Sequence, residues 1–326
     1  MKTIFISRLQ LAAKQLGVAL LVLVVAVVAG CGGKNSQLNT PITEGGANES
    51  WSIKHELGTV KLDQVPQKIV VLDTYLLDIA LALGLRPIGA PTESPGKEEL
   101  PSYLKPYVDY DLTWVGARND PNLEVLAGLE PDLIVADLQR HQKSYEALEK
   151  IAPTMVVSGS GAEDWKTIIT QLGEATRQQE KAKTVIADFE QKLEAGKAEL
   201  AGSGFRAVAP ITLYPKSIIR IYTAQSYTGA ILQGLGLELP YEAGGKPFEE
   251  LSVEAIGDVK ADAFILMQSP EHTADVIPEE YPIFGSLDVV KSGHAYTVSM
   301  EQWLFYRGPL AGEVIIREAI DLFAKS

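Results

Sequence analysis

The sequence predicts an α/β fold with two lobes, each built on a central parallel sheet, joined by one long α-helix. Three observations carry this prediction. Short apolar runs alternate with helical patterns, a long amphipathic segment interrupts the alternation, and a weak internal repeat relates the two sides of that segment. Strands that alternate with helices of this length are typical of parallel sheets.

Residues 1–30 are predicted to be a signal peptide. A basic stretch precedes an apolar run at 16–29, which is shorter than the roughly 20 residues that a membrane-spanning helix needs. The run ends in Val28-Ala29-Gly30-Cys31 and resembles the bacterial lipobox, in which the cysteine receives a lipid and the leader is cut before it. The alternative is an uncleaved anchor helix over residues 10–30 with an incidental cysteine.

Residues 31–50 are rich in Gly, Ser, Asn and Thr and have no periodicity. This composition predicts a flexible tether with an r.m.s. reach of about 25 Å. Two acyl chains at Cys31 would hold such a tether stably on a membrane, where a single chain would not.

The N-terminal lobe is predicted over residues 51–177. Its first buried strand is 68–72 (KIVVL), followed by a helix at 75–83 that Gly84 ends at its C′ position. Later elements are strands that start at 87 and span 133–136 and 155–157, with a helix at 145–150.

Residues 178–201 are predicted to be one helix of about six turns that connects the lobes. Charged residues fill the face opposite a set of apolar residues at helical spacing. These are Ala182, Val185, Ile186, Phe189, Leu193 and Leu200.

The alternation resumes in the C-terminal lobe, predicted over 202–326. Its expected elements are strands at 207–213, 218–222 and 263–266 and a helix at 227–234.

The repeat aligns LEVLAGLEPDLIVA (123–136) with VEAIGDVKADAFIL (253–266) without a gap. It pairs Glu124 with Glu254 and Asp132 with Asp262. Because charged positions match as well as apolar ones, the repeat predicts two homologous lobes related by a pseudo-twofold axis.

Charge and composition exclude several classes of protein. The net charge is −13, and it is −16 from Cys31 onward because residues 1–30 hold three basic residues and no acidic one. Such a surface repels phosphate backbones and makes a nucleic-acid partner unfavourable. A single cysteine and four scattered histidines predict no metal site. Neither a phosphate loop nor a nucleophile elbow is present, so we expect no enzyme activity.

The order of these features resembles bacterial helix-backbone (class III) substrate-binding lipoproteins, which serve ABC importers of ferric siderophores, haem and cobalamin. HELGTVKLDQVPQKIVVL (55–72) is similar to the family's opening hairpin and first strand, and VGARNDPNLEVLAGLEPDLIVAD (115–137) to its Glu-bearing motif. RHQKSYEALEKIAPTMVV (140–157) and WLFYRGPLAGEVI (303–315) resemble the iron–siderophore and ferric citrate branch.

The resemblance implies two Rossmann-like lobes with a largely pre-formed ligand cleft between them. It also implies a monomer in the bacterial cell envelope, lipid-anchored at Cys31 on the periplasmic or extracellular face of a membrane. Such a protein captures a ferric siderophore or a citrate-like chelate and delivers it to an ABC importer. No cofactor is expected, because the iron arrives inside the chelate. The alternatives are a cobalamin- or haem-binding member of the same fold, a Zn/Mn-binding relative, or a sensor.

The expected ligand contacts are arginines and aromatic residues. Arg140 follows the strand at 133–136, so it lies at the carboxyl edge of the sheet, where ligand clefts form in α/β proteins. The resemblance implies a contact at Arg140 too, and it adds six more residues: Arg220, Arg307, Trp303, Tyr306, Tyr214 and Tyr227. Each aromatic residue has the alternative of a core position.

Three further positions near these contacts bear on the ligand. Phe305 stands where many relatives carry another arginine, which lowers the positive charge of the site. Arg118 is a weaker candidate for a contact, and His141 is expected on a helix surface.

In the family, one exposed glutamate on each lobe docks into arginines of a permease subunit. Glu124 and Glu254 match those positions, and they fall at equivalent places in the repeat. A twofold receptor requires this symmetry. The alternative is that both are helix-start glutamates that interact favourably with the helix dipole.

Overall fold

The computed structural model describes residues 50–93, 96–159, 161–214, 218–242, 244–252, 254–268 and 281–324. The predicted signal peptide, Cys31 and the tether up to residue 49 lie outside the described residues. Gly45–Ser326 form one compact unit. Within the described ranges, none of the helices combines the length and apolar character that crossing a bilayer requires.

The N-terminal lobe opens with an antiparallel hairpin of β1 (Trp51–His55) and β2 (Gly58–Leu62). A six-stranded sheet follows, in the order β6-β5-β4-β3-β7-β8, and only its β5–β6 pair is antiparallel. Its strands are β3 (Ile69–Val71), β4 (Gly89–Thr92), β5 (Thr113–Ala117), β6 (Asp120–Pro121), β7 (Leu133–Asp137) and β8 (Thr154–Val157). The central strands are buried throughout, as expected for parallel strands covered on both faces.

Short helices connect these strands. They are α1 (Thr74–Ala82), η1 (Lys105–Tyr107), α2 (Leu123–Gly128), α3 (Leu138–His141), η2 (Gln142–Ser144), α4 (Tyr145–Glu149) and α5 (Asp164–Ala175). The Asp73 carboxylate caps α1 by accepting from the Tyr75 amide, and Gly84 ends the helix with φ +81°. The left-handed conformation at Gly84 favours a residue without a Cβ, as the sequence predicted.

The C-terminal lobe is built on a five-stranded sheet in the order β11-β10-β9-β12-β13. Its strands are β9 (Val208–Tyr214), β10 (Ile218–Tyr222), β11 (Phe248–Ser252), β12 (Ala263–Gln268) and β13 (Ala295–Ser299). The β9, β12 and β13 strands are parallel, whereas β10 is antiparallel to both its neighbours. The sheet is therefore mixed, not purely parallel, because residues 215–217 are too few for the crossover that a parallel partner would need.

The helices of this lobe are α7 (Tyr227–Gly234), η3 (Ala255–Asp258), α9 (Pro282–Gly285), α10 (Asp288–Lys291), η4 (Glu301–Phe305) and α11 (Pro309–Phe323). Like α1, α7 ends at a glycine with positive φ, Gly236 (+85°). The Leu237 amide then donates to the Leu232 carbonyl, as the Leu85 amide donates to the Ala80 carbonyl after α1. Both helices thus end in the same Schellman-type turn.

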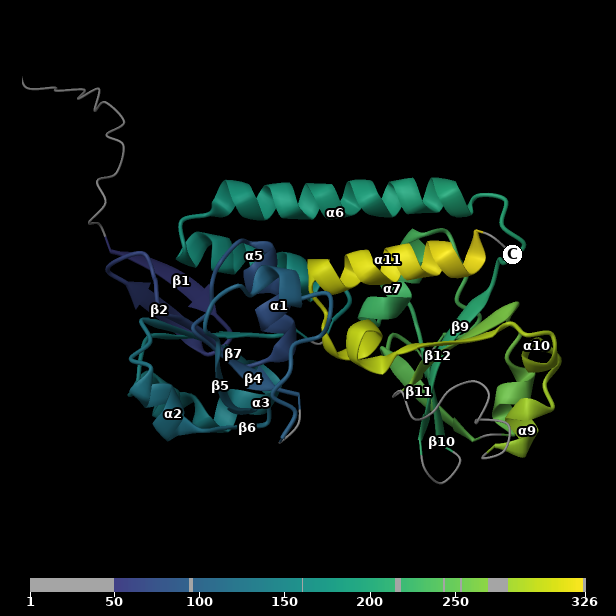
Figure 1. Ribbon diagram of the computed structural model, residues 1–326, viewed down its shortest axis with the longest axis horizontal. Helices are drawn as coiled ribbons and strands as arrows, with labels where there is room; N and C mark the ends of the chain where they lie inside the picture. Colours follow the sequence, from purple (N-terminus) through teal and green to yellow (C-terminus); the bar gives the residue numbers. More distant parts are fainter. Residues whose placement is uncertain are drawn as a thin grey trace, which may run out of the picture. The chain divides into compact units, whose positions relative to one another are not determined.

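The long helix α6 (Gln179–Leu200) connects the lobes and packs along α5 and α11 (Figure 1). Ala182, Phe189 and Leu200 are buried, and Val185, Ile186 and Leu193 pack partly buried against the same core. The apolar face predicted from the sequence is confirmed.

The internal repeat has a structural counterpart in both lobes. Asp132, before β7, accepts from the amides of Gln67 and Lys68 (2.8 and 2.9 Å), which lead into β3. Asp262, before β12, accepts from the amides of Arg206 and Ala207 (both 2.8 Å), which lead towards β9. Each repeated aspartate therefore ties the start of its own strand to the entry of the parallel strand beside it.

A buried carboxylate joins α1 of the N-terminal lobe to α11 of the C-terminal lobe. Asp78 accepts from the amides of Leu310 (3.0 Å) and Ala311 (2.8 Å) and from the Tyr103 hydroxyl (3.0 Å). Gly308 is required beside it, since a Cβ there would collide with the Asp78 side chain. The lobes are thus tied together by α11 as well as by α6.

Candidate functional site

A cavity of about 330 Å³ is lined by both lobes. From the N-terminal lobe it receives residues at the carboxyl ends of β5 and β7, the position that α/β sheets offer to ligands. The lining residues are Arg118, Asp137, Gln139, Arg140, Gly159, Tyr214, Arg220, Tyr222, Ser226, Tyr227, Thr228, Pro247, Phe248, Trp303, Leu304, Phe305 and Arg307. Four arginines are among them, and we call Arg118, Arg140, Arg220 and Arg307 the cavity arginines.

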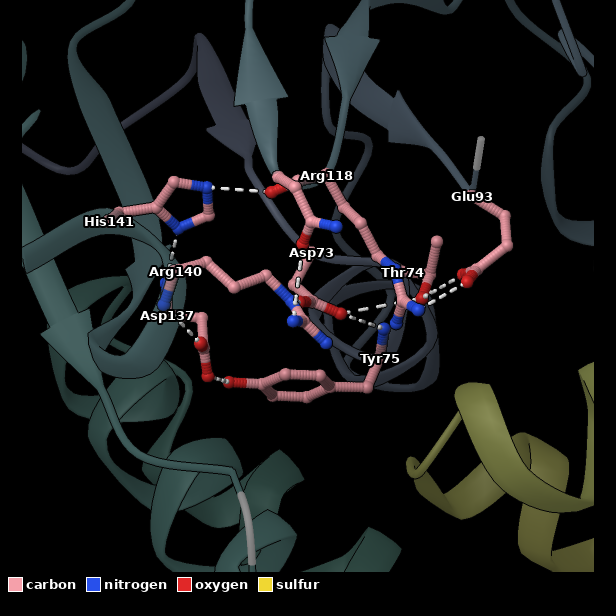
Figure 2. A network of polar contacts seen from close by, with 9 residues as sticks. Asp73, Thr74, Tyr75, Glu93, Arg118, Asp137, Arg140 and His141 are labelled. Atoms are coloured by element: carbon pink, nitrogen blue, oxygen red, sulfur yellow. Dashed lines mark hydrogen bonds and ion pairs between the residues drawn. The ribbon is translucent and has the colours of Figure 1, made fainter. Parts of the chain in front are cut away.

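Arg140 lies one turn after β7, where the sequence placed it. The Asp137 carboxylate caps α3 by accepting from the Arg140 amide (3.1 Å). The Arg140 Nε donates to the Asp73 carboxylate at 2.5 Å (Figure 2). The Arg140 Nη1 donates to the side chain of Asn119 at 3.2 Å. Because Asp73 is 0% exposed, this ion pair holds the guanidinium firmly at the wall of the cavity.

Arg118, the weaker candidate from the sequence, directly follows β5 and also lines the cavity. Its Nη2 lies 2.5 Å from Glu93 Oε1, and its guanidinium stands 4.9 Å from the centre of the Phe305 ring. The rule that selected Arg140, a position at the carboxyl end of a parallel strand, selects Arg118 equally well.

Arg220 faces the cavity from β10. Its Nε and Nη2 form a forked ion pair with Glu250 Oε1 (3.0 and 2.9 Å) on the neighbouring strand β11. The guanidinium also lies 4.7 Å from the Tyr214 ring centre and 4.6 Å from that of Phe248. Phe248 was not predicted, because only the pairing of β10 with β11 brings it beside Arg220.

Arg307 follows η4, and its guanidinium lies 4.9 Å from the centre of the Tyr75 ring. Among the described residues, the buried Nε atoms of Arg118 and Arg307 have no hydrogen-bond partner. A buried donor without an acceptor is costly, and these two Nε atoms are closed to solvent as well.

The predicted aromatic contacts differ in whether their rings face the cavity or the protein core. Tyr214 lines the cavity beside Arg220, whereas Trp303 is fully buried and its indole N–H donates to Glu318 (2.6 Å). The Tyr227 hydroxyl donates to the Gly308 carbonyl (2.6 Å). Tyr306, 2% exposed, is not among the lining residues and packs edge-on against Tyr103. Trp303 and Tyr306 have core positions that leave no ring face for stacking, so we leave both out of the proposed contacts.

His141 is fully buried, which corrects the expectation of a surface histidine. Its Nδ1 accepts from the Asp137 amide (3.1 Å), so the ring proton lies on Nε2, which donates to the Arg118 carbonyl (2.9 Å) (Figure 2). Burial lowers the pKa of the imidazole and keeps it neutral. The ring therefore links the two segments that carry Arg118 and Arg140.

Glu124 and Glu254 are both exposed and lie outside the cavity lining. Glu124 is in the first turn of α2, which Asn122 caps, and Glu254 directly precedes η3. Across the described ranges, no group of three or more His, Cys, Asp and Glu side chains could hold a metal ion.

Comparison with known proteins gives a consistent result. The family model described as periplasmic binding protein matches residues 69–300. The chain is 28% identical to the Fe(3+)-citrate-binding protein YfmC of Bacillus subtilis (93% of this chain, 94% of the relative). It is 26% identical to the Fe(3+) dicitrate-binding periplasmic protein FecB of Escherichia coli (83% and 90%).

A solved structure agrees with these relatives. Staphylococcus aureus SirA complexed with staphyloferrin B superimposes with a TM-score of 0.70 at 26% identity, over 83% of this chain and 98% of that one. The two-lobed α/β fold predicted from the sequence is therefore confirmed, and the chain belongs to the periplasmic binding protein family.

Proposed function

We propose that this chain captures a ferric siderophore or a ferric citrate-like chelate in the cavity and delivers it to an ABC-type importer. The observation that carries the proposal is the convergence of four cavity arginines from both lobes on one cavity. Relatives over most of the chain's length are named for ferric citrate, which favours this function over cobalamin or haem binding.

The charge distribution supports an anionic ligand. Because the chain from Cys31 onward carries −16, its mean field repels anions, and local positive charge must overcome that repulsion. Guanidinium groups in a partly desolvated cavity supply this charge and pair bidentately with carboxylate oxygens. The chelate's own oxygens coordinate the iron, so the protein recognises the outside of the complex. No catalytic role is proposed.

The test is a titration of the purified full-length chain with ferric citrate, a ferric hydroxamate, a ferric catecholate, cobalamin and haemin. Quenching of its four tryptophans reports binding, and the same titration of free tryptophan corrects for absorption by the ligand. We expect saturable quenching by at least one ferric chelate. Saturation by cobalamin or haemin alone would contradict the proposal.

We also propose that the mature chain is held in the bacterial cell envelope, on the periplasmic or extracellular face of a membrane, by lipid on Cys31. The lipobox-like Val28-Ala29-Gly30-Cys31 supports this anchor. Mass spectrometry of the membrane-extracted protein should show a lipid-modified N-terminal cysteine, and Cys31→Ser should leave a soluble or uncleaved protein. An unmodified thiol on the membrane-extracted protein would rule the anchor out.

Glu124 and Glu254 are proposed to dock the monomeric chain onto the two permease subunits. Their exposure and their equivalent places in the repeat support this role.

A further inference from the structure

Glu93 lies behind one of the cavity arginines and was not singled out by the sequence. It follows β4, and its side chain is 13% exposed. Its Oε1 is paired with Arg118 at 2.5 Å, and the Thr74 hydroxyl donates weakly to Oε2 at 3.4 Å (Figure 2). The Arg118 side chain is equally buried, at 14% exposed, so water screens this pair poorly.

The charges around Glu93 oppose one another. Arg118 and Arg140 favour the carboxylate, whereas Asp73 and Glu301 disfavour it. Burial is the largest effect and raises the pKa of Glu93 to about 7. Near neutral pH, Glu93 is therefore present both as the carboxylate that pairs with Arg118 and as the neutral acid.

Arg118 has donors to offer a ligand. Arg118 lines the cavity, and its guanidinium lies against the ring of Phe305, which is also a lining residue. An anionic oxygen bound there would stand close to the Glu93 carboxylate. In a poorly solvated site, two negative charges sharing one guanidinium repel strongly, and the carboxylate accepts a proton.

We propose that Glu93 is a specificity-determining residue that competes with an anionic chelate for Arg118, so that binding of the chelate is coupled to uptake of one proton by Glu93. The inference rests on the proposed function, since it requires an anionic ligand in the cavity. The proton comes from solvent and converts the carboxylate to the neutral acid. Binding of a neutral chelate, without free carboxylates, would not be coupled to protonation of Glu93.

The coupling has a definite sign. At pH 6 most Glu93 is protonated and no longer neutralises the charge of Arg118, so binding is tight. At pH 8 the ionised form dominates and must be protonated on binding. With a pKa of about 7, the dissociation constant should rise about tenfold between pH 6 and pH 8.

The experiment measures binding of ferric citrate to the full-length chain at pH 6, 7 and 8, with Glu93→Gln as the test variant. Glutamine cannot ionise, so this variant should bind at pH 8 about as tightly as the wild type binds at pH 6. Calorimetry at pH 7 in PIPES and Tris buffers counts the protons. We expect the wild type to take up about half a proton more than Glu93→Gln, and the difference cancels the titration of citrate itself.

Glu250→Gln is the matched control. Glu250 pairs with Arg220 at a similar distance, but its side chain is 50% exposed and solvent screens it. This variant should keep the wild-type pH dependence. If Glu93→Gln does not fold, Arg118→Gln is the second test variant. Without the Arg118 guanidinium, the chelate and Glu93 no longer compete for a positive charge. The pH dependence of binding should therefore vanish in this variant.

Two results separate the possible failures. If the wild type and Glu93→Gln show the same pH dependence and proton count, the role of Glu93 is overturned while the proposed function stands. If the wild type binds neither ferric citrate nor the ferric hydroxamate and catecholate at any of the three pH values, the proposed function itself fails.

Discussion

The cavity arginines differ in how firmly the protein already holds them. Arg140 is paired with fully buried Asp73, and Arg220 with half-exposed Glu250. The guanidinium of Arg307 lies against the Tyr75 ring, and its Nε has no hydrogen-bond partner within the described part of the chain. Substitution of each arginine should therefore change affinity and stability in different proportions.

We expect Arg307→Ala to weaken binding of the cognate chelate by about 10- to 150-fold, the cost of about 1.5–3 kcal/mol for a charged hydrogen-bond donor. Its stability should change little. Arg140→Ala should lose affinity and also about 3 kcal/mol of stability, because it leaves the Asp73 carboxylate buried and unpaired. Chelate titration and thermal unfolding measure the two effects.

Arg220→Ala should lose affinity in the same range, with a smaller stability cost because Glu250 can be hydrated. The matching Arg→Lys variants should recover only part of the loss, since an ammonium cannot reproduce the planar fork. Losses within about twofold for all three Arg→Ala variants, with unchanged melting temperatures, would mean that shape and aromatic contacts recognise the ligand. The three arginines would then not be ligand contacts.

Asp78 should respond to pH because it is fully buried between α1 and α11. Burial raises its pKa to about 7, against the hydrogen bonds from Leu310, Ala311 and Tyr103. A carboxyl whose folded-state pKa lies above its unfolded value stabilises the protein most at low pH, and this contribution is lost as the pH rises towards 7.

Asp78→Asn replaces one acceptor oxygen by an N–H donor that faces the backbone N–H groups of Leu310 and Ala311. This change should lower the free energy of unfolding by roughly 1–3 kcal/mol. The deficit should be largest below about pH 4, the ordinary pKa of an aspartate, and should shrink as the pH rises through 7. Denaturant unfolding at several pH values tests this, with exposed Asp109→Asn as the control. A deficit that grows with pH would contradict the assignment.

At the scale of elements, the repeated aspartates should contribute to stability in the same way in both lobes. Asp262→Ala removes the acceptor of two amides at the entry to β9, and Asp132→Ala does so at the entry to β3. Each substitution should lower the free energy of unfolding by roughly 1–3 kcal/mol at pH 7.

The backbone bonds from Ala207 and Arg206 lower the pKa of Asp262. Its contribution is therefore present above its ordinary pKa and should be lost as the pH falls through the folded-state pKa, the opposite of Asp78. Unfolding of the variants, with exposed Asp258→Ala as the control, measures these effects. If only one lobe responded, the two aspartates would not be equivalent.

At the scale of the whole molecule, the docking proposal predicts a separation of binding from uptake. Glu124→Ala with Glu254→Ala should bind chelate as the wild type does, because both residues lie outside the cavity lining. Uptake by cells should fall strongly, since docking loses a carboxylate on each lobe. Chelate titration and iron-uptake assays measure the two properties. Reduced chelate affinity with intact permease association would contradict the proposal.

Where local patterns carry the information, the sequence predicts the structure well. The buried face of α6, the glycine ends of α1 and α7, and the position of Arg140 after β7 all follow from spacing along the chain. The direction of β10 does not, because an apolar run reads alike in parallel and antiparallel pairs. Phe248 and Glu93 reach the site only through the contacts of neighbouring strands.

What the sequence by itself determined is the two-lobed α/β architecture, its connecting helix and the arginine-bearing segments at the sheet edge. Periodicity, end signals and the repeat are properties of residues near one another in the chain. The tertiary structure decided which side chains face the cavity and which form the core. It placed Arg118 and Glu93 beside the cavity and packed Trp303, Tyr306 and His141 into the interior. Burial and charge pairing depend on partners far away in sequence, so only the folded chain could assign these roles.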